Sequence, residues 1–151
     1  MTTQLLSRST KASSDAQETL TLDNWLAEFE DCVRSRDTDR GRQLFDENVY
    51  AFGTRADVAT GLDDLVKNQW TPIWLNTQGF HFLFESAKYI VSDDRSTVCA
   101  MVSWESHAVE NGQKGYLRSG RCTLALRKDS SAPFGYLAMH SHFSKLPKAE
   151  F

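Results

Sequence analysis

The chain has 151 residues, of which 40% are hydrophobic and 25% charged, the size and balance of one globular domain. Its formal net charge is -3, from 17 Lys and Arg residues against 20 Asp and Glu residues, so a surface that neutralises many nucleic-acid phosphates is not expected. No run of residues resembles a membrane span or the apolar core of a secretion signal, so we expect a cytoplasmic protein with neither nucleic acid nor a membrane as partner.

Residues 1–20 differ in composition from the rest of the chain. They are rich in Ser, Thr and charged side chains and contain few large aliphatic ones. Such a segment buries too little apolar surface to offset the entropy lost on ordering, so a flexible leader is predicted there. A single domain is then expected to span residues 21–151.

Three helices are predicted before any long strand. In the first, apolar residues recur at spacings of three and four, which places them on one helix face. These residues are Leu22, Trp25, Leu26, Phe29 and Val33. A short second helix is predicted over residues 40–46. The third begins after Gly61, and Pro72 is expected to end or kink it at Thr71.

The chain from Gly79 onward is aromatic and β-branched and alternates in polarity, which favours strands. Four long strands are predicted over residues 79–91, 97–109, 116–127 and 134–143. The breaks between them are only a few turn-forming residues long, so antiparallel hairpins are expected. Helices followed by an antiparallel meander define an α+β domain.

Four strings of residues resemble a known superfamily. They are AFGT at 51–54, GLDDL at 61–65, SGRCTLALRKD at 119–129 and MHSHFSKLP at 139–147. Together they resemble the nuclear-transport-factor-2-like superfamily and, within it, SnoaL-like proteins related to the association domain of calcium/calmodulin-dependent protein kinase II. The resemblance implies a cone-shaped, cystatin-like fold, in which a highly curved antiparallel sheet wraps around three N-terminal helices and encloses a pocket. It also implies a homodimer formed through the outer face of the sheet.

Apolar residues occur on both faces of the predicted strands, as a pocket on one side and a second copy on the other require. One set comprises Val98, Ala100, Val102, Trp104, Cys122, Leu124 and Leu126. The other comprises Cys99, Met101, Leu137, Met139 and Phe143. The expected partner is therefore the chain itself.

The resemblance also suggests where catalytic residues would lie. Related isomerases use a carboxylate base and a donor tyrosine in an apolar cavity. Approximate matching puts Phe52 and Phe29 at those two positions, and a phenyl ring cannot transfer a proton. An isomerase or cyclase reaction would need a non-standard acid or base, such as Glu105 or Asp57, so whether the domain is an enzyme stays open.

Kinase hub domains similar to this chain bind carboxylates through pocket arginines, and the matching positions here are Ser103, Thr123 and Phe143. Arg121 and Glu105 lie two residues away on the same predicted faces, because strand side chains alternate. A guanidinium there can bind an anionic ligand, or it can pair with Glu105 across the strands. The two roles are compatible.

Trp74, beyond the proline, is the candidate for a pocket rim or lid, and Ser141 completes the predicted ligand-binding set. Ser141 lacks the Gly-x-Ser-x-Gly context of hydrolases. His140 and His142 share one strand face, but two ligands without a third do not make a metal site. No metal and no cofactor are therefore expected.

The sequence predicts a homodimeric protein with a pocket for a small anionic or apolar ligand, of the SnoaL-like type. The resemblance leaves two alternatives. One is a non-catalytic association module that multimerises through the outer sheet face, and the other is an isomerase-like or cyclase-like enzyme. Fold analogy cannot decide between them, because function depends on the residues of the site.

Overall fold

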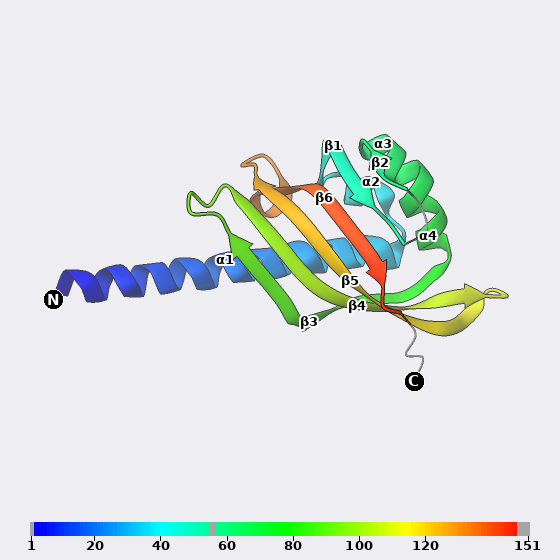
Figure 1. Cartoon of the computed structure of the whole chain (residues 1–151), viewed down its shortest axis with the longest axis horizontal. Helices are drawn as coiled ribbons and strands as arrows, with labels where there is room; N and C mark the ends of the chain where they lie inside the picture. Colours follow the sequence, from blue (N-terminus) through cyan, green and yellow to red (C-terminus); the bar gives the residue numbers. More distant parts are fainter. Residues whose placement is uncertain (1, 55–56, 148–151) are drawn as a thin grey trace.

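A computed structural model describes residues 2–54 and 57–147, with side chains from residue 14 onward. In Figure 1 a long helix crosses a curved sheet, and shorter helices lie at one end of that sheet. The sheet has six strands in the order β2-β1-β6-β5-β4-β3. The predicted α+β class, with helices and a curved sheet, is confirmed.

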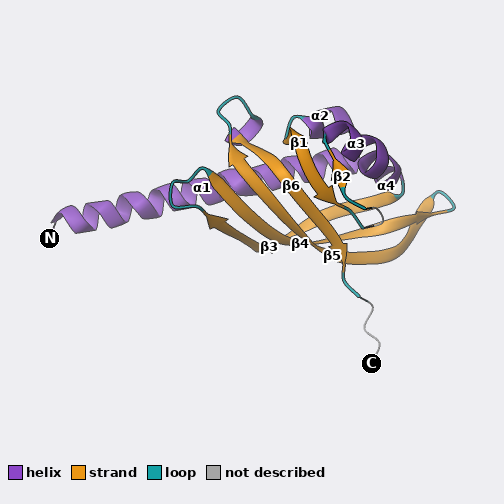
Figure 2. Cartoon of the chain, turned by 45° about the horizontal axis from the view of Figure 1, so that its top comes forward, coloured by secondary structure: helices purple, strands orange, loops and turns teal. Residues whose placement is uncertain are grey.

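Helices and strands have the following bounds. The helices are α1 (Thr2–Ser35), α2 (Thr38–Arg42), α3 (Leu62–Leu65) and α4 (Thr71–Leu75), with a π-helical turn η1 (Val66–Trp70) and a 3₁₀ turn η2 (Pro133–Gly135). The strands are β1 (Phe45–Phe52), β2 (Ala59–Thr60), β3 (Thr77–Val91), β4 (Thr97–Glu110), β5 (Gln113–Lys128) and β6 (Tyr136–Lys145). Figure 2 shows the main helices gathered behind one face of the sheet.

The long strands β3, β4, β5 and β6 form the antiparallel meander that the short turns predict. β1 departs from this pattern, because it runs parallel to β6 with Tyr50 opposite His140 and Phe52 opposite His142. A hairpin would impose an antiparallel pair, whereas β1 is separated from β6 by the helices and the whole meander.

The first helix begins at Thr2, so the segment predicted as a leader is the start of α1. Its later residues are attached to the body of the domain. The Arg95 guanidinium pairs with Asp15 at 2.5 Å and with Glu18 at 3.1 Å, and the Tyr136 hydroxyl donates to Glu18 at 3.0 Å. These contacts tie residues 15 and 18 to the turn between β3 and β4 and to the start of β6, and the domain boundary at residue 21 stays a prediction. The flexibility of the earlier residues stays a prediction.

The apolar face predicted for the first helix is confirmed. Its five residues, from Leu22 to Val33, are all at most 5% exposed. Burial of side chains of this size contributes roughly 1.5–3 kcal/mol each relative to exposure in water. This face therefore fixes α1 against the concave side of the sheet.

The third helical segment continues past Pro72 to Leu75, so it does not end at Thr71, but the change from the π-helical turn to α4 falls at this residue, where an end or a kink is predicted. Pro72 has no backbone N–H to donate, and its ring crowds the preceding turn. The five residues before Thr71 form a π-helical turn, and this wider turn accommodates the proline within the helix. Trp74 consequently lies inside α4.

A bulge in β6 changes which side chains face the helices. The register between β5 and β6 shifts between Ala125 and Leu126, where β6 contributes one extra residue, Met139. Because strand side chains alternate, one extra residue reverses the facing of every residue after it. Ser141 and Phe143 are thereby turned toward the helices.

The strand β3 bends around α1 at a break in its ladder with β4. The register shifts between Gln78 and His81, and such irregularities bend and twist a strand. At this bend the Glu30 carboxylate of α1 accepts a hydrogen bond from the Phe82 backbone N–H at 2.7 Å. The helix therefore holds the bend that closes one wall of the domain.

Candidate functional site

An apolar cavity lies between α1, the η1–α4 segment and the concave face of the sheet. It offers about 70 Å³ to water-sized molecules, which is enough for a few waters or a small ligand. Its walls are dominated by six aromatic side chains. They are Phe29, Trp70, Trp74, Phe80, Trp104 and Phe143.

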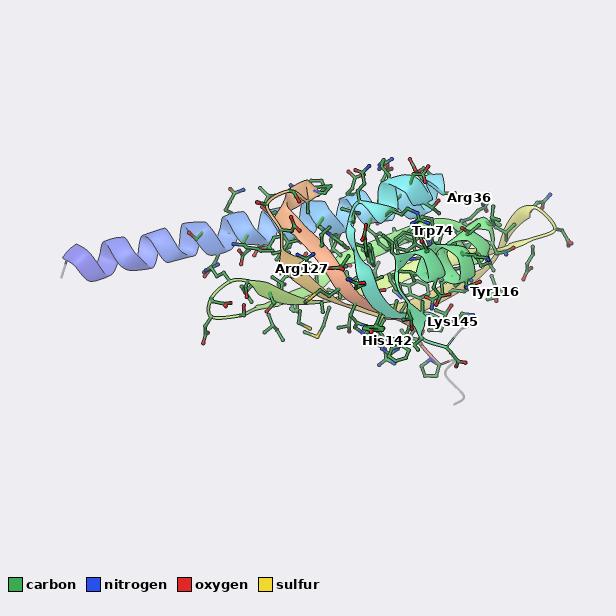
Figure 3. All side chains as sticks on the ribbon, turned by 90° about the horizontal axis from the view of Figure 1, so that it is seen from above. Arg36, Trp74, Tyr116, Arg127, His142 and Lys145 are labelled. Carbon is green, nitrogen blue, oxygen red and sulfur yellow. The ribbon has the colours of Figure 1, made fainter. Side chains whose placement is uncertain are left out.

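The aromatic wall is built around Phe29. Its ring centroid lies 5.9 Å from that of Trp74 and 6.1 Å from that of Phe143. Trp70 and Trp74 stack on each other with centroids 4.8 Å apart and planes 16° from parallel. Figure 3 shows Trp74 in the helical region, where its ring also approaches Gly41 of α2. Trp74 is thus a packed wall of the cavity, and the prediction that places it on a rim or lid beyond the helix is wrong.

Arg118 is the one charged side chain among the described residues that line the cavity. It is 7% exposed, and its Nη2 donates to Thr77 Oγ1 at 2.8 Å and to the Asn76 carbonyl at 3.3 Å. The Thr77 hydroxyl donates in turn to the Ile73 carbonyl at 2.7 Å, so its oxygen is oriented to accept from Arg118. Arg118 pairs with Ser106 in the β4–β5 register, and both side chains line the cavity.

Gln69 positions the end of β1 at the cavity. Its Nε2 donates to the Ala51 carbonyl at 3.4 Å and to the Asp57 carbonyl at 3.3 Å. A Cβ at Gly53 would lie 2.7 Å from the Gln69 side-chain oxygen, so a larger residue at Gly53 would push this amide away. The polar lining therefore combines a guanidinium, an amide and hydroxyls. It comprises Thr54, Gln69, Thr77, Ser106, Arg118 and Ser141.

Among its described lining residues, the cavity has no group that titrates near neutral pH. None of the described lining residues is Asp, Glu, His, Cys or Tyr, and an arginine side chain keeps its proton. Glu105 lies on the other face of the sheet, and Asp57 is exposed and outside the lining, so neither supplies the non-standard base considered above. Burial raises the pKa of the nearby Cys122 thiol well above its usual value, which keeps it protonated.

Three of the seven residues predicted to bind a ligand line the cavity. They are Trp74, Ser141 and Phe143. Ser141 is 2% exposed, and the β6 bulge is what turns it and Phe143 inward. The structure brings these three together with Arg118, although their binding of a ligand stays a prediction.

The other four predicted residues lie on the outer face of the sheet, so their placement at the pocket is wrong. Arg121 lies opposite Ser103, and Thr123 lies opposite Met101, two residues along. The neighbouring residues Trp104 and Cys122 are buried on the concave side, and adjacent strand residues point to opposite faces. Glu105 shares the facing of Ser103. Within the described structure, Arg121 and Glu105 also form no ion pair with each other, which removes the alternative of an internal pair.

Arg118 was missed by sequence reasoning, although the signal for it is present. The buried set Cys122, Leu124 and Leu126 establishes which positions of β5 face inward. The same alternation extended toward the N-terminal end of the strand places Arg118 on that face. An arginine in step with three apolar core residues therefore indicates a buried guanidinium.

The histidine pair of β6 faces away from the cavity. The His140 ring nitrogen Nδ1 lies 2.7 Å from the Tyr50 carbonyl, and His142 is exposed on the side opposite α1 (Figure 3). The Phe52 ring packs against both, with centroids 5.9 Å and 5.2 Å away. In the described part of the chain, no three His, Cys, Asp or Glu side chains are grouped so that they could hold a metal.

The comparisons with known proteins place this architecture in a family. The profile of the SnoaL-like domain family matches residues 22–148, which is most of the chain. The chain belongs to this family. The superfamily resemblance drawn from the sequence strings is thereby confirmed. No curated protein sequence matches the chain.

Solved structures with the same fold share little sequence with this SnoaL-like domain. A nuclear transport factor 2-like superfamily protein from Salmonella enterica has a TM-score of 0.74 at 16% identity, with 89% of this chain and 95% of that chain covered. A putative dehydratase from Streptomyces avermitilis has a TM-score of 0.69 at 14% identity, covering 87% and 99%. The CaMKII hub of S. rosetta has a TM-score of 0.66 at 18% identity, covering 83% and 95%. At these identities the likeness establishes the fold alone.

A search of the described helices for membrane spans finds none that is both long and apolar enough. The described part of this SnoaL-like domain offers two candidate functional surfaces, the concave cavity and the outer face of its sheet.

Proposed function

We propose that this domain binds a small amphipathic carboxylate, with the carboxylate at Arg118 and the apolar part against the aromatic wall. The observation that carries this proposal is a guanidinium 7% exposed in a cavity whose other described lining residues are apolar or neutral. Ligand pockets are mostly apolar with a few convergent polar groups, and a guanidinium matches a carboxylate in charge and geometry. The hydroxyl of Ser106, the cross-strand partner of Arg118, also lines the cavity, as does that of Ser141.

Binding without proton transfer is the activity that this set of residues favours. Isomerisation and dehydration both need a group that accepts or donates a proton near the substrate. The described lining provides hydroxyls, an amide and a guanidinium, whose pKa values lie far from neutrality. The proposed role is therefore that of a binding protein, and dehydratase activity is not part of the proposal.

The proposal is tested by the thermal stability of the protein with a panel of small monocarboxylates, compared with the corresponding alcohols and amides. A ligand at one hundred times its Kd should stabilise the fold by about 2.7 kcal/mol, which raises the Tm measurably. We expect Arg118→Met to weaken carboxylate binding in calorimetry at least tenfold. Arg121→Met, which removes the same charge from the outer face, should leave binding unchanged.

Arg118 also contacts Asn76 and Thr77, so the folded state of its variants needs a separate check. Circular dichroism of Arg118→Met establishes whether the variant is folded, and Arg118→Lys retains the charge if the methionine variant is not. Carboxylates and alcohols that stabilise the protein equally would contradict the proposal. So would a folded Arg118→Met variant that binds as tightly as the wild type.

We also propose that the domain associates with a second copy through the outer face of the sheet. Large apolar side chains on this face are between 37% and 60% exposed, namely Tyr50, Phe52, Ile90, Met101 and Leu117. They are distributed over β1, β3, β4 and β5, and exposed apolar side chains on one face of a sheet can pack against another molecule. The likeness to a kinase hub domain supports self-association, and the exposed apolar side chains make this face the candidate surface.

Self-association predicts that the wild type elutes in light-scattering chromatography with twice the mass of one chain. Met101→Asp puts a charge into the face and is expected to yield monomers, because an unpaired carboxylate is costly to bury. Leu75→Asp is the matched control, since Leu75 is an apolar residue of α4 that is 55% exposed. A dimer that survives Met101→Asp, or a wild type that is monomeric at high concentration, would contradict this use of the face.

A further inference from the structure

Arg121 and Glu105 lie close to each other on the outer face of the sheet. They are on adjacent strands, where Arg121 is opposite Ser103 and Glu105 is opposite Ser119. Diagonal neighbours of this type are roughly 7–8 Å apart between their Cα atoms. Arg121 is exposed and Glu105 is partly exposed. Among the described residues, neither of the two forms an ion pair.

The immediate surroundings of these two charges are polar. Between β4 and β5 their direct partners are Ser103 and Ser119. On the flanking strands, Ser144 of β6 lies opposite Arg121 and His81 of β3 lies opposite Glu105. The three serines are short and leave room above the sheet for side chains from another molecule. Apolar residues, including Met101, flank this polar centre on the same face.

Symmetry makes this arrangement self-complementary. In a two-fold dimer the same surface serves both copies, so residue i of one copy meets residue j of the other, and j meets i. A two-fold axis that lies in the plane between the two faces and crosses the Arg121–Glu105 line at right angles at its midpoint places each guanidinium over the other copy's carboxylate. One pair of opposite charges on the face thus becomes two ion pairs in the dimer.

We propose that two copies pack outer face to outer face about an axis between Arg121 and Glu105, with the two residues forming reciprocal ion pairs across the interface. This inference rests on the proposed self-association and adds to it the register of the two sheets. Apolar contacts alone permit many relative positions of two sheets. Charge pairs select one of them, because any shift that brings like charges together is unfavourable.

The same geometry distinguishes a second copy from another protein as the occupant of this face. A different partner would need its own complementary charges, whereas a second copy supplies both by symmetry. We therefore assign Arg121 and Glu105, which the sequence pattern predicts to bind a ligand, to self-recognition.

Charge reversal tests the pairing, with the dimer dissociation constant measured by sedimentation equilibrium. Arg121→Glu places two carboxylates together at each contact, and Glu105→Arg places two guanidinium groups together. Each single variant is expected to weaken the dimer at least tenfold. The double variant Arg121→Glu/Glu105→Arg should return to within about threefold of the wild type, because each opposite pair is restored in reverse.

Mixing the two single variants provides an independent readout. In the mixture, one chain carries two acidic residues and the other carries two basic residues, so both contacts of a heterodimer are satisfied. We expect the mixed sample to dimerise more tightly than either variant alone. Lys67→Glu, an exposed charge reversal on η1, controls for the change in net charge and should leave the dimer intact.

The outcomes separate this inference from the proposal on which it rests. A wild type that stays monomeric overturns self-association and the pairing together. A wild-type dimer that neither single variant weakens overturns the pairing and leaves self-association standing. Weakened single variants without recovery in the double variant and in the mixture also overturn the pairing, because damage to the surface would then explain the loss.

Discussion

Trp25→Ala is expected to lower the free energy of unfolding by about 3–5 kcal/mol, a large part of the stability of a domain of this size. Trp25 has no exposed surface, and its ring centroid lies 5.9 Å from those of Phe29 and of Phe45. Truncation removes the buried indole and leaves a hole beside the residue on which the cavity wall is built. Urea unfolding, with the midpoint and slope fitted together, measures this loss.

Two further variants establish which property of Trp25 matters. Trp25→Phe retains an aromatic ring but removes the hydrogen bond from Nε1 to the Tyr136 carbonyl, 3.2 Å long, so a smaller loss of about 1–3 kcal/mol is expected. Leu20→Ala changes a neighbouring residue of α1 that is 54% exposed, and it should change stability by less than about 0.5 kcal/mol. A Trp25→Ala protein as stable as Leu20→Ala would show that α1 does not pack as described.

The fold could be predicted from the sequence where one physical signal dominates. The spacing of Leu22 to Val33 indicates a helix with one buried face, and the alternation after Gly79 indicates strands joined by short turns. Local propensity predicts that the helix ends at Pro72, but the helix continues past it. Trp70 and Trp74 lie on either side of the proline, and their packing against Phe29 and Gly41 stabilises the helical conformation there. A π-helical turn then accommodates the proline, which is a tertiary effect that no local pattern contains.

The site was predicted less well than the fold, because a pocket depends on which way each strand faces. The resemblance to hub domains grouped Ser103, Thr123 and Phe143 as one set, yet the first two face outward and the third faces the cavity. Strand side chains alternate between the two faces, so the apolar Trp104 and Cys122 on the inner face indicate that the adjacent Ser103 and Thr123 face outward. This reasoning would have corrected the assignment of those two residues. The extra residue Met139 is recognisable only from the pairing of β5 with β6, so the facing of Phe143 could not have been derived from the sequence.

Gly120→Val is expected to destabilise the domain by more than about 3 kcal/mol or to prevent it from folding, beyond the usual range for overpacked sites. Gly120 lies opposite Trp104 on the concave face. A Cβ at Gly120 would lie 2.1 Å from the Ser144 backbone carbonyl and 2.3 Å from the Trp104 ring. Real contacts of this kind are not that short, and the carbonyl belongs to β6, so relief requires the sheet itself to shift.

The same substitution should also affect the cavity, because Trp104 is one of its walls. The indole lies over Gly120, and its Nε1 donates to the Arg121 carbonyl at 3.2 Å, which fixes the ring along β5. A larger residue would displace this ring toward the cavity, so any folded Gly120→Val protein should also lose carboxylate binding.

Ser119→Val is the matched control, since it adds the same branched side chain one residue earlier, on the outer face. Urea unfolding of both variants and calorimetry with the carboxylate panel measure the two effects. Equal stability of the two valine variants would contradict the close packing of Trp104 on Gly120.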